Sequence, residues 1–324
     1  MVNITFKNVG QGDSIVLEWE DKLAIIDCNL YNGGNPVLDH LKKNRVKKIE
    51  FIILSHPHTD HFSGFHELLS YCIEEDIHVN RFLHTAQSTP AFLKSANRSR
   101  ESDTKLMALF ALLKEMLDNK QIEIYAINDN PDMAIPLGEE FKLEVLSPSS
   151  LEIDKYIKKE SYGFDEEDEK SNPDANWLST ILKISNSKYY VLLTSDAIKS
   201  SFSRIGKRKN SRLKDLKLYL GQSPHHGSKG NLNESFWQIR KRCSNTPIII
   251  SVGENHYGHP AAAVTDFFNK TPNYELRQTQ NEIIISSTAQ NVSRILDTFS
   301  TSVNEIHGTD LAYCLKTNTI EQLV

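Results

Sequence analysis

Hydrophobic and polar positions in the first part of the chain follow the pattern of short β-strands. Apolar stretches there are separated by polar, glycine-containing or charged segments that suit turns. Short strands joined by tight turns predict antiparallel pairing. A continuous apolar stretch then has the length of a buried strand and ends directly before a histidine-rich segment. We expect these strands at residues 4–6, 14–18, 23–27 and 49–54.

Helical spacing of apolar residues alternates with further strand patterns along the rest of the chain. Helices are expected at residues 36–44, 65–73 and 104–119. Later strands are expected at residues 78–84, 122–127, 141–146, 179–185, 189–194, 216–220, 247–252 and 282–287. This order indicates an α/β protein and suits a sandwich of two mixed sheets with helices outside, although the order alone does not select that architecture.

Composition excludes several other classes of protein. The chain has 324 residues, 39% hydrophobic and 24% charged, which is typical of globular rather than disordered or fibrous proteins. The net charge of −5 shows no overall basic excess that would indicate a polyanionic partner. Residues 149–175 are acidic and polar, and we expect them to form a solvated insertion.

Cysteine usage and hydropathy indicate a cytoplasmic protein without a membrane segment. The four cysteines are far apart and form no Cys-x-x-Cys pair, which suits a reducing compartment. The N-terminal residues alternate like a strand and lack the features of a secretory signal. No apolar stretch approaches the ~20 residues that a spanning helix needs.

The strongest chemical signal is the segment 56–61, which reads His-Pro-His-Thr-Asp-His. Imidazole and carboxylate groups are the ligands that zinc and manganese prefer. In a compact turn, His56 and His58 can face one metal ion while Asp60 and His61 face a second, with the ions ~3.5–4 Å apart. A polar loop with incidental histidines is the alternative, but four potential ligands directly after a strand argue against it.

The segment 56–61 matches the HxHxDH signature of the metallo-β-lactamase superfamily. Further segments resemble, in the same order, motifs of the hydrolase domain of ComEC-type DNA-uptake proteins. They are the turn at 8–14 (VGQGD), the strand at 23–27, and the segments 176–179 (Asn-x-x-Ser), 192–196 (family motif LLTGD), 223–228 (PHHGS) and 255–260 (N-x-YGHP). Ser195 stands where the LLTGD motif has glycine, a small change with little expected chemical consequence. The resemblance implies an αββα sandwich of two mixed sheets flanked by helices. It also implies a hydrolase domain over residues 1–290, followed by an extension at 291–324 of unknown role.

The resemblance also implies two divalent metal ions, zinc or manganese, and a set of ligands for them. The expected ligands are His56, His58, Asp60, His61, Asp196, His225, His226 and Asn176. Of the adjacent pair we favour His225, with His226 orienting it or contacting substrate. Asn176 stands where other members of the superfamily have a histidine, and it is a weaker ligand.

Two residues are expected to be catalytic, and other acids and histidines nearby are expected to be structural or to support the ligands. The expected catalytic residues are Asp60 and His259. His259 could protonate a leaving group or bind a phosphoryl oxygen. A surface histidine is the alternative for His259. Asp27 is expected to be structural or to support a ligand, Asp13 to orient the site, and His84 to be a buried structural histidine.

The ComEC-like motifs imply cleavage of phosphodiesters, and therefore a nuclease acting on DNA or RNA through a hydroxide that bridges the metals. Residues 199–217 contain eight basic residues and one acid, a density that could neutralise phosphates, although a solvated loop is an equally weighted alternative. The expected substrate-binding residues are Lys207, Arg208, Lys209 and Ser228.

A free-standing nuclease in DNA processing or in defence against foreign DNA is the preferred hypothesis for the pathway. The alternatives are a hydrolase of a small phosphodiester, lactone or ester, and a catalytically weak subunit that binds nucleic acid or a protein. The acidic insertion or the C-terminal extension could provide the protein contact.

Overall fold

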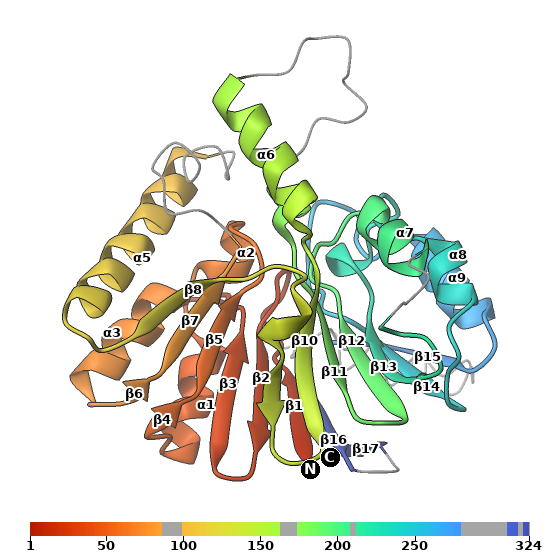
Figure 1. The fold of residues 1–324 in the computed structure, drawn as a ribbon, viewed down its shortest axis with the longest axis horizontal. Coiled ribbons are helices and arrows are strands. Elements are labelled where there is room, and N and C mark those ends of the chain that lie inside the picture. Colours follow the sequence, from red (N-terminus) through yellow and green to blue (C-terminus); the bar gives the residue numbers. More distant parts are fainter. Residues whose placement is uncertain (86–98, 163–173, 208–211, 280–309, 317–319, 324) are drawn as a thin grey trace, which may run out of the picture.

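Two mixed β-sheets pack face to face with helices on both outer sides in the computed structural model (Figure 1). The structure describes residues 1–85, 99–162, 174–207, 212–279, 310–316 and 320–323. In these residues the first sheet has eight strands in the order β17-β16-β1-β2-β3-β5-β7-β8. The second has seven, in the order β15-β14-β13-β12-β11-β10-β9.

The strands of the first sheet come from both ends of the chain. They are β1 (Val2–Phe6), β2 (Ile15–Trp19), β3 (Lys22–Ile26), β5 (Phe51–Leu54), β7 (Arg81–His84), β8 (Glu123–Ala126), β16 (Leu311–Leu315) and β17 (Ile320–Leu323). The short strands β4 (Lys48–Ile49) and β6 (His78–Val79) pair separately. The antiparallel pairing expected at the N-terminus is confirmed, because β2 pairs antiparallel with both β1 and β3.

The second sheet is built from the middle of the chain. Its strands are β9 (Ile135–Leu137), β10 (Phe141–Ser147), β11 (Ile181–Ser185), β12 (Tyr189–Leu193), β13 (Lys217–Gln222), β14 (Thr246–Ile250) and β15 (Tyr274–Gln278). The strand expected at 282–287 lies outside the described residues.

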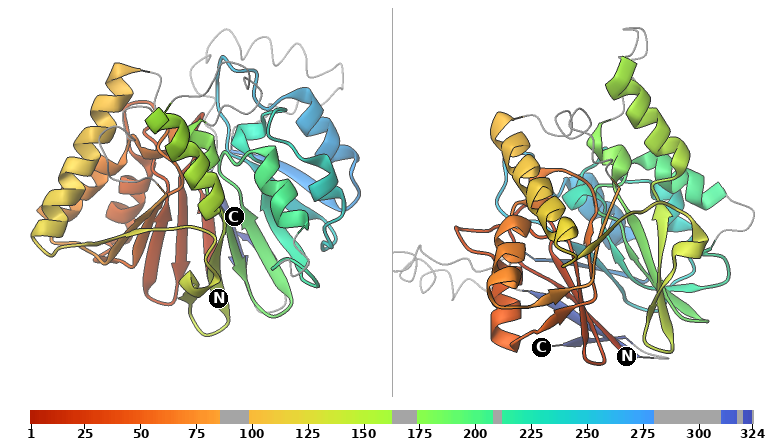
Figure 2. Two further views of the ribbon diagram at one scale, coloured as in Figure 1. Left: turned by 45° about the horizontal axis from the view of Figure 1, so that its top comes forward. Right: turned by 60° about the vertical axis from the view of Figure 1, so that its left-hand side comes forward.

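Helices cover the outer face of each sheet, which completes the four layers of an αββα sandwich (Figures 1 and 2). The helices on the side of the first sheet are α1 (Pro36–Asn44), α2 (Thr59–Phe62), α3 (Phe65–Glu74) and α5 (Arg100–Asp118). Those on the side of the second are α7 (Lys199–Lys207), α8 (Glu234–Gln238) and α9 (Ala262–Lys270). The expected fold class is thereby confirmed.

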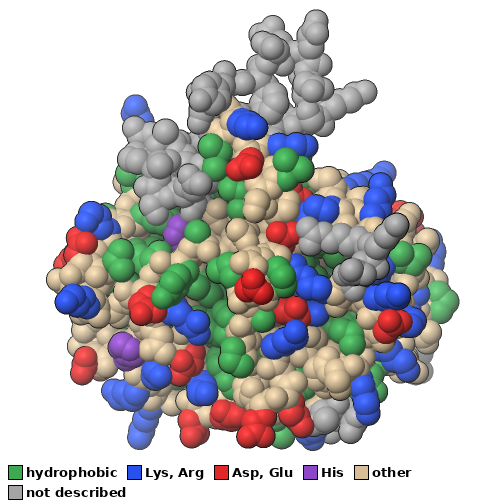
Figure 3. Space-filling view, in the orientation of Figure 1, with side chains coloured by type: hydrophobic (Ala, Val, Ile, Leu, Met, Phe, Trp, Pro, Cys, Tyr) green, Lys and Arg blue, Asp and Glu red, His purple; other side chains and the backbone are tan. Residues whose placement is uncertain are grey.

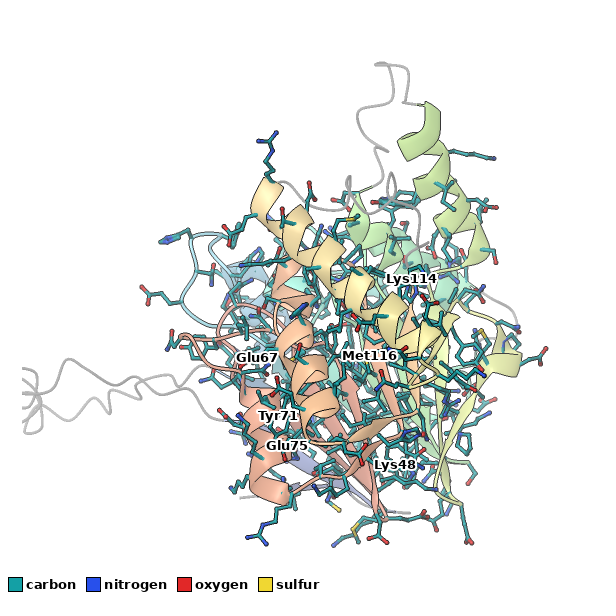
Figure 4. All side chains as sticks on the ribbon, turned by 90° about the vertical axis from the view of Figure 1, so that its left-hand side faces the viewer. Lys48, Glu67, Tyr71, Glu75, Lys114 and Met116 are labelled. Carbon is teal, nitrogen blue, oxygen red and sulfur yellow. The ribbon has the colours of Figure 1, made fainter. Side chains whose placement is uncertain are left out.

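Each helix turns an apolar side to its sheet and a polar side to solvent. Met116 of α5 is buried with Leu68 and Leu113 in the core between helices and sheet. Glu67, Tyr71 and Glu75 follow one another along the outer side of α3 (Figure 4). A separate core between the two sheets combines residues such as Leu17 and Leu143. Burial on both faces explains why the central strands are almost entirely apolar.

In both sheets, the carboxyl ends of the parallel strands lie at one edge of the sandwich. In the first sheet β3, β5, β7 and β8 run parallel, and in the second β12, β13, β14 and β15 do so. Loops that follow the carboxyl ends of parallel strands lie together at one edge, where ligands of open α/β sheets bind. The helix α2, which begins three residues after the histidine-rich segment starts, lies at this edge (Figure 1).

The acidic insertion begins with a helix that packs against the body of the protein. Helix α6 (Ser150–Tyr162) projects from the same edge (Figures 1 and 2), and its Tyr156 is fully buried. Glu152 of α6 accepts hydrogen bonds from Arg204 of α7, which also binds Asp129. The start of this segment is therefore held to the core, whereas the acidic stretch 165–169, on which the expected insertion rests, lies outside the described residues.

The C-terminal extension contributes to the first sheet. Strand β16 pairs with β1 over its whole length, and β17 continues the sheet beyond β16. Residues of the proposed extension at 291–324 thus share a core with the N-terminal strands. Within the described residues, no helix combines the length and the apolar character needed to cross a bilayer.

The ion pair between α6 and α7 predicts a pH-dependent contribution to stability. Burial alone would raise the pKa of Glu152, but Arg204 and hydrogen bonds from Ser149 and Ser201 outweigh it and lower this pKa. A lowered pKa stabilises the fold above the carboxyl's unfolded pKa of about 4.3, and this stabilisation is lost as the pH falls through the folded value. We expect Glu152→Gln to lower the free energy of unfolding at pH 7 by about 1–3 kcal/mol, because Arg204 loses one of its two carboxylate partners.

Urea denaturation of Glu152→Gln and the unaltered protein, followed from pH 7 downward, would measure this effect. The difference between the two proteins should shrink below about pH 4. Asp154→Asn, an exposed change on the same helix, serves as the control and should alter little. A difference that stays constant with pH would contradict the assignment.

Candidate metal centre

The histidine-rich segment folds into a strand end followed by one short helix. His56 follows β5, His58 precedes the first turn of α2, and His61 lies within α2. His56 and His61 are fully buried, whereas His58 is partly exposed. The ring nitrogens His56 Nε2 and His58 Nδ1 lie 3.0 Å apart. These two ring nitrogens therefore lie close enough to each other to contact one cation.

Asp196, which follows β12 of the second sheet, lies opposite this segment. Its Oδ1 is 3.4 Å from His61 Nε2, and its Oδ2 is 3.7 Å from His56 Nε2. His225 and His226 follow β13, and their Nε2 atoms lie 3.3 Å and 3.5 Å from the same carboxylate. Four imidazoles from two sheets thus converge on one buried aspartate.

Asp60 extends the cluster toward solvent. Its Oδ2 lies 3.4 Å from His226 Nε2, and its side chain is partly exposed. His226 therefore stands between Asp60 and Asp196. The sequence favoured His225 as the ligand, but the geometry gives His226 the more central position of the two.

Hydrogen bonds on the far side of the rings fix the tautomers of His61 and His226. His226 Nδ1 lies 2.8 Å from the carbonyl oxygen of Ser251, which can only accept, so Nδ1 carries the hydrogen. His61 Nδ1 likewise donates to Asp27 Oδ2 at 2.7 Å. In the neutral rings the Nε2 lone pairs consequently point at Asp196, as metal-binding histidines require.

His225 is oriented in the same way by Asn231. The Asn231 amide nitrogen donates to the carbonyl oxygens of Asp196 and Ala197. Its oxygen is therefore free to accept from His225 Nδ1, 3.1 Å away. The Nε2 of neutral His225 then also presents a lone pair to Asp196.

A chain of hydroxyls orients His56. Ser195 Oγ donates to Ser55 Oγ at 2.8 Å, and Ser55 Oγ donates to Asp27 Oδ2 at 2.6 Å. Each hydroxyl has a single hydrogen, so the nearby His56 Nδ1, 3.2 Å from Ser55 Oγ, must donate. Asp27 thus supports two of the imidazoles, in keeping with the supporting role expected for it.

The electrostatics of the cluster favour a bound cation. Burial would lower the pKa of His226, yet Asp196, Asp60 and Asp13 raise it to about 9. Burial would likewise lower the pKa of His61, which Asp196, Asp27 and Asp60 raise well above its ordinary value. The carboxylates therefore attract positive charge at the position of the Nε2 protons, and a divalent ion supplies more of it than a proton.

Several buried nitrogen and oxygen atoms of the cluster are available to bind a metal ion, because they have no hydrogen-bond partner. His61 Nε2, Asp196 Oδ1 and His226 Nε2 are buried and make no hydrogen bond. In the described residues, sets of three side chains bring donor atoms within 4.8 Å of one another. These sets are His56, His61 and Asp196; Asp60, His61 and His226; Asp13, Asp196 and His226; and Asp13, Asp27 and His61. The overlap at His61 and Asp196 suits two neighbouring ions.

Backbone strain accompanies the site. Asp27, Ser195, His225 and His226 have φ values between 44° and 59°, the left-handed region that costs non-glycine residues of order 1 kcal/mol or more. Asp27 follows β3 directly, Ser195 lies two residues after β12, and His225 and His226 lie three and four residues after β13. The strained turns redirect the chain so that the side chains face the centre.

Asp13 is more closely involved than the sequence indicated. It is 2% exposed, accepts a hydrogen bond from Gln222 Nε2 at 2.9 Å, and belongs to two of the four sets. The sequence signal was an acid directly after the turn at 10–12, interpreted as orienting the site. Supporting side chains such as Ser55, Ser195 and Asn231 carry no such signal, because serine and asparagine are common in turns.

The other expected site residues lie at varying distances from the centre. Asn176, in the 3₁₀ turn Ala175–Leu178, is buried, and its Oδ1 makes no hydrogen bond. Thr180 N, four residues later, donates to Ser55 O, so this segment runs beside the end of β5. Asn176 as a ligand remains a prediction. His84 packs against Phe82 and Phe110, as expected of a structural histidine.

Two of the four expected substrate-binding residues lie in the described part of the chain, and their role remains a prediction. Ser228 follows the His225–Gly227 turn directly. Lys207 is the last residue of α7. Arg208 and Lys209 lie outside the described residues.

Replacing Asp27 by asparagine tests the role of the supporting carboxylate. The substituted side chain would keep the left-handed backbone, which asparagine tolerates, but would lose the charge that orients His61. We expect Asp27→Asn to weaken zinc binding by about 10–100-fold, measured by competition with a chelating dye. Asp76→Asn is a matched control, because Asp76 also has a positive φ but is exposed. Unchanged zinc affinity in Asp27→Asn would refute this role.

Comparison with known proteins found one family model and several solved structures that are similar to this chain. Residues 8–100 match the model of the Metallo-beta-lactamase superfamily. A search among curated proteins found no match. Among solved structures, the chain is similar to the metallo-beta-lactamase fold protein YhfI from Bacillus subtilis, with 14% identity and a TM-score of 0.49 over 86% of this chain and 96% of that one.

Two further solved structures have lower scores. The zinc-bound PqqB from Methylobacterium extorquens has 8% identity and a TM-score of 0.46, covering 86% of this chain and 98% of that one. A long-form RNase Z from yeast has 9% identity and a TM-score of 0.42, covering 100% of this chain and 49% of that one. The chain forms two mixed sheets between layers of helices, and its residues 8–100 match the model of the Metallo-beta-lactamase superfamily.

Proposed function

We propose that this chain is a hydrolase that uses two divalent metal ions to cleave phosphodiesters, with DNA or RNA as the preferred substrate class. The observation that carries the proposal is the convergence of four imidazole Nε2 atoms on Asp196, with Asp60 beside them. The ComEC-like motifs at 192–196, 223–228 and 255–260 favour a phosphodiester over a carboxylic ester.

Some residues of the site would hold the metal ions, and others would contact the substrate. His56, His58, His61, Asp196, His225, His226 and Asp60 would hold the ions, zinc or manganese, with Asn176 and Asp13 as further candidates. Such ions would polarise a phosphoryl oxygen and make a water nucleophilic at neutral pH. Asp60, at the exposed side of the cluster, is the residue best placed to accept a proton from that water.

His259 is oriented toward a substrate-binding role. Its Nδ1 lies 3.5 Å from the amide nitrogen of Gln11, which can only donate, so Nδ1 accepts and Nε2 carries the hydrogen. Its ring lies 5.5 Å from that of His225. Burial, together with His225 and His226, lowers the pKa of His259. A neutral ring with an Nε2–H group is suited to donate to a phosphoryl oxygen.

The charge distribution favours a second candidate, a small phosphodiester or a lactone. Two arginines of the basic stretch are used inside the protein: Arg204 binds Glu152 and Asp129, and Arg212 donates to the carbonyl oxygen of Asp129. On the face seen in Figure 3, basic side chains are interspersed with acidic ones. Neither feature adds to the positive electrostatic potential that a protein needs to bind long nucleic acids.

Activity should depend on His61, the residue shared by three of the four sets of potential ligands. Purified protein with manganese or zinc is expected to cleave labelled single-stranded DNA or RNA. His61→Ala should lower kcat/KM by more than about a hundredfold, because a ligand matters at least as much as the groups that support it. Gel-resolved cleavage would measure kcat/KM, and elemental analysis would measure the metal bound to each protein.

His66→Ala provides the matched control, since His66 is an exposed histidine of α3, and it should leave cleavage unchanged. Cleavage without any divalent ion, or full activity in His61→Ala, would contradict the mechanism. Turnover of a lactone or of bis(p-nitrophenyl) phosphate, but of no polynucleotide, would favour the second candidate.

A further inference from the structure

Tyr257 has an aromatic side chain whose exposure to solvent is not explained by the packing of the fold. Its exposed fraction is 76%, the highest among the large hydrophobic side chains of the described residues. A single exposed hydrophobic residue needs no explanation by itself. The position of Tyr257 beside the candidate metal centre, however, indicates a role in binding.

A row of rings connects Tyr257 with the centre. The ring of Tyr257 lies 6.0 Å from that of His259 with an angle of 30° between the planes. The ring of His259 lies 5.5 Å from that of His225, whose Nε2 is 3.3 Å from Asp196. The row therefore runs from the buried carboxylate, through two histidines, to an aromatic face in solvent.

The loop that presents Tyr257 is held in place by Asn255. The Asn255 amide nitrogen donates to the carbonyl oxygens of Gly253 and His259, at 2.8 Å and 2.7 Å. Its oxygen accepts from the backbone N–H groups of Tyr257 and His259, at 3.0 Å and 3.1 Å. All the hydrogen-bonding capacity of one amide is thus used to shape this turn.

A close backbone contact fixes the base of the same loop. A Cβ atom at Gly253 would lie only 2.4 Å from Gly10 Cα, so the loop after β14 packs directly on the turn after β1. The position of Tyr257 relative to the metal centre is therefore set by the fold. An aromatic ring held in place before binding loses little entropy when a ligand stacks on it.

We propose that Tyr257 is a stacking platform for a base of the substrate, and that it selects nucleotide-containing phosphodiesters over those without a base. This inference rests on the proposed phosphodiesterase function. A base is separated from its phosphate by one sugar, so a phosphate at the centre leaves its base near the outer end of the row of rings. Every base has a π-face, so stacking on a tyrosine tolerates any sequence. Such a platform would provide affinity for nucleic acid without a large basic surface.

The test compares two single-stranded oligonucleotides of equal length, one normal and one carrying abasic sites around the cleavage position. For the normal oligonucleotide, Tyr257→Ala should raise KM by about 5–100-fold and leave kcat nearly unchanged. For the abasic oligonucleotide, Tyr257→Ala and the unaltered protein should have similar KM values. Tyr257→Phe, which keeps the ring, should behave like the unaltered protein on both.

Tyr125→Ala, a change at another exposed tyrosine on the edge strand β8, is the matched control and should alter neither substrate's KM. An active enzyme in which Tyr257→Ala has the same KM as the unaltered protein on both oligonucleotides would overturn the stacking role alone. An equal fall in kcat on both substrates would also overturn it, because Tyr257 would then act by positioning His259. Failure of the unaltered protein to cleave any phosphodiester with either metal would overturn the proposed function, and the stacking role with it.

Discussion

Asp196 is the group on which the arrangement of the whole site depends. It is a fully buried carboxylate, and burying a charge without compensation would cost several kcal/mol. Compensation comes from His61 of the first sheet and His226 of the second, whose pKa values Asp196 and the neighbouring carboxylates raise. The two halves of the sandwich must therefore approach in one orientation for this charge to be tolerated. The same requirement brings the potential metal ligands together.

A series of hydrogen bonds connects the two sheets, so the orientation of the side chains in it depends on how one sheet is placed relative to the other. Ser195 from the second sheet donates to Ser55 of the first, and Ser55 donates to Asp27, which accepts from His61. Each hydroxyl in this series has one hydrogen to give, so its direction is fixed. The orientation of two imidazoles is thereby coupled to the packing of one sheet on the other, and the site is rigid before any ligand binds.

Local sequence patterns were sufficient for most of the N-terminal half. The helix at 36–44 matches α1, because Asn35 caps it and Pro36 begins it, and both signals are local. The motif at 56–61 identified the centre because its donors are close in sequence. Strand β16 was missed, since its pairing with β1 depends on residues some 300 positions apart, and α6 was missed because it was grouped with the acidic stretch 165–169 that follows it. Whether His225 or His226 lies closer to Asp60 depends on two strained turns that residue types alone do not reveal.

The pairing of β16 with β1 has a consequence for how the chain reaches its folded state. Val2–Phe6 is made first, yet one of its two neighbouring strands, Leu311–Leu315, comes near the end of the sequence. During synthesis the outer side of β1 exposes unpaired backbone groups, the kind of edge that recruits strands from other molecules. Contacts of such long range also slow folding, because the loop must close before the pairing is gained. Shortening the chain near position 290 would make this temporary edge permanent and promote aggregation, even though all the potential metal ligands would remain.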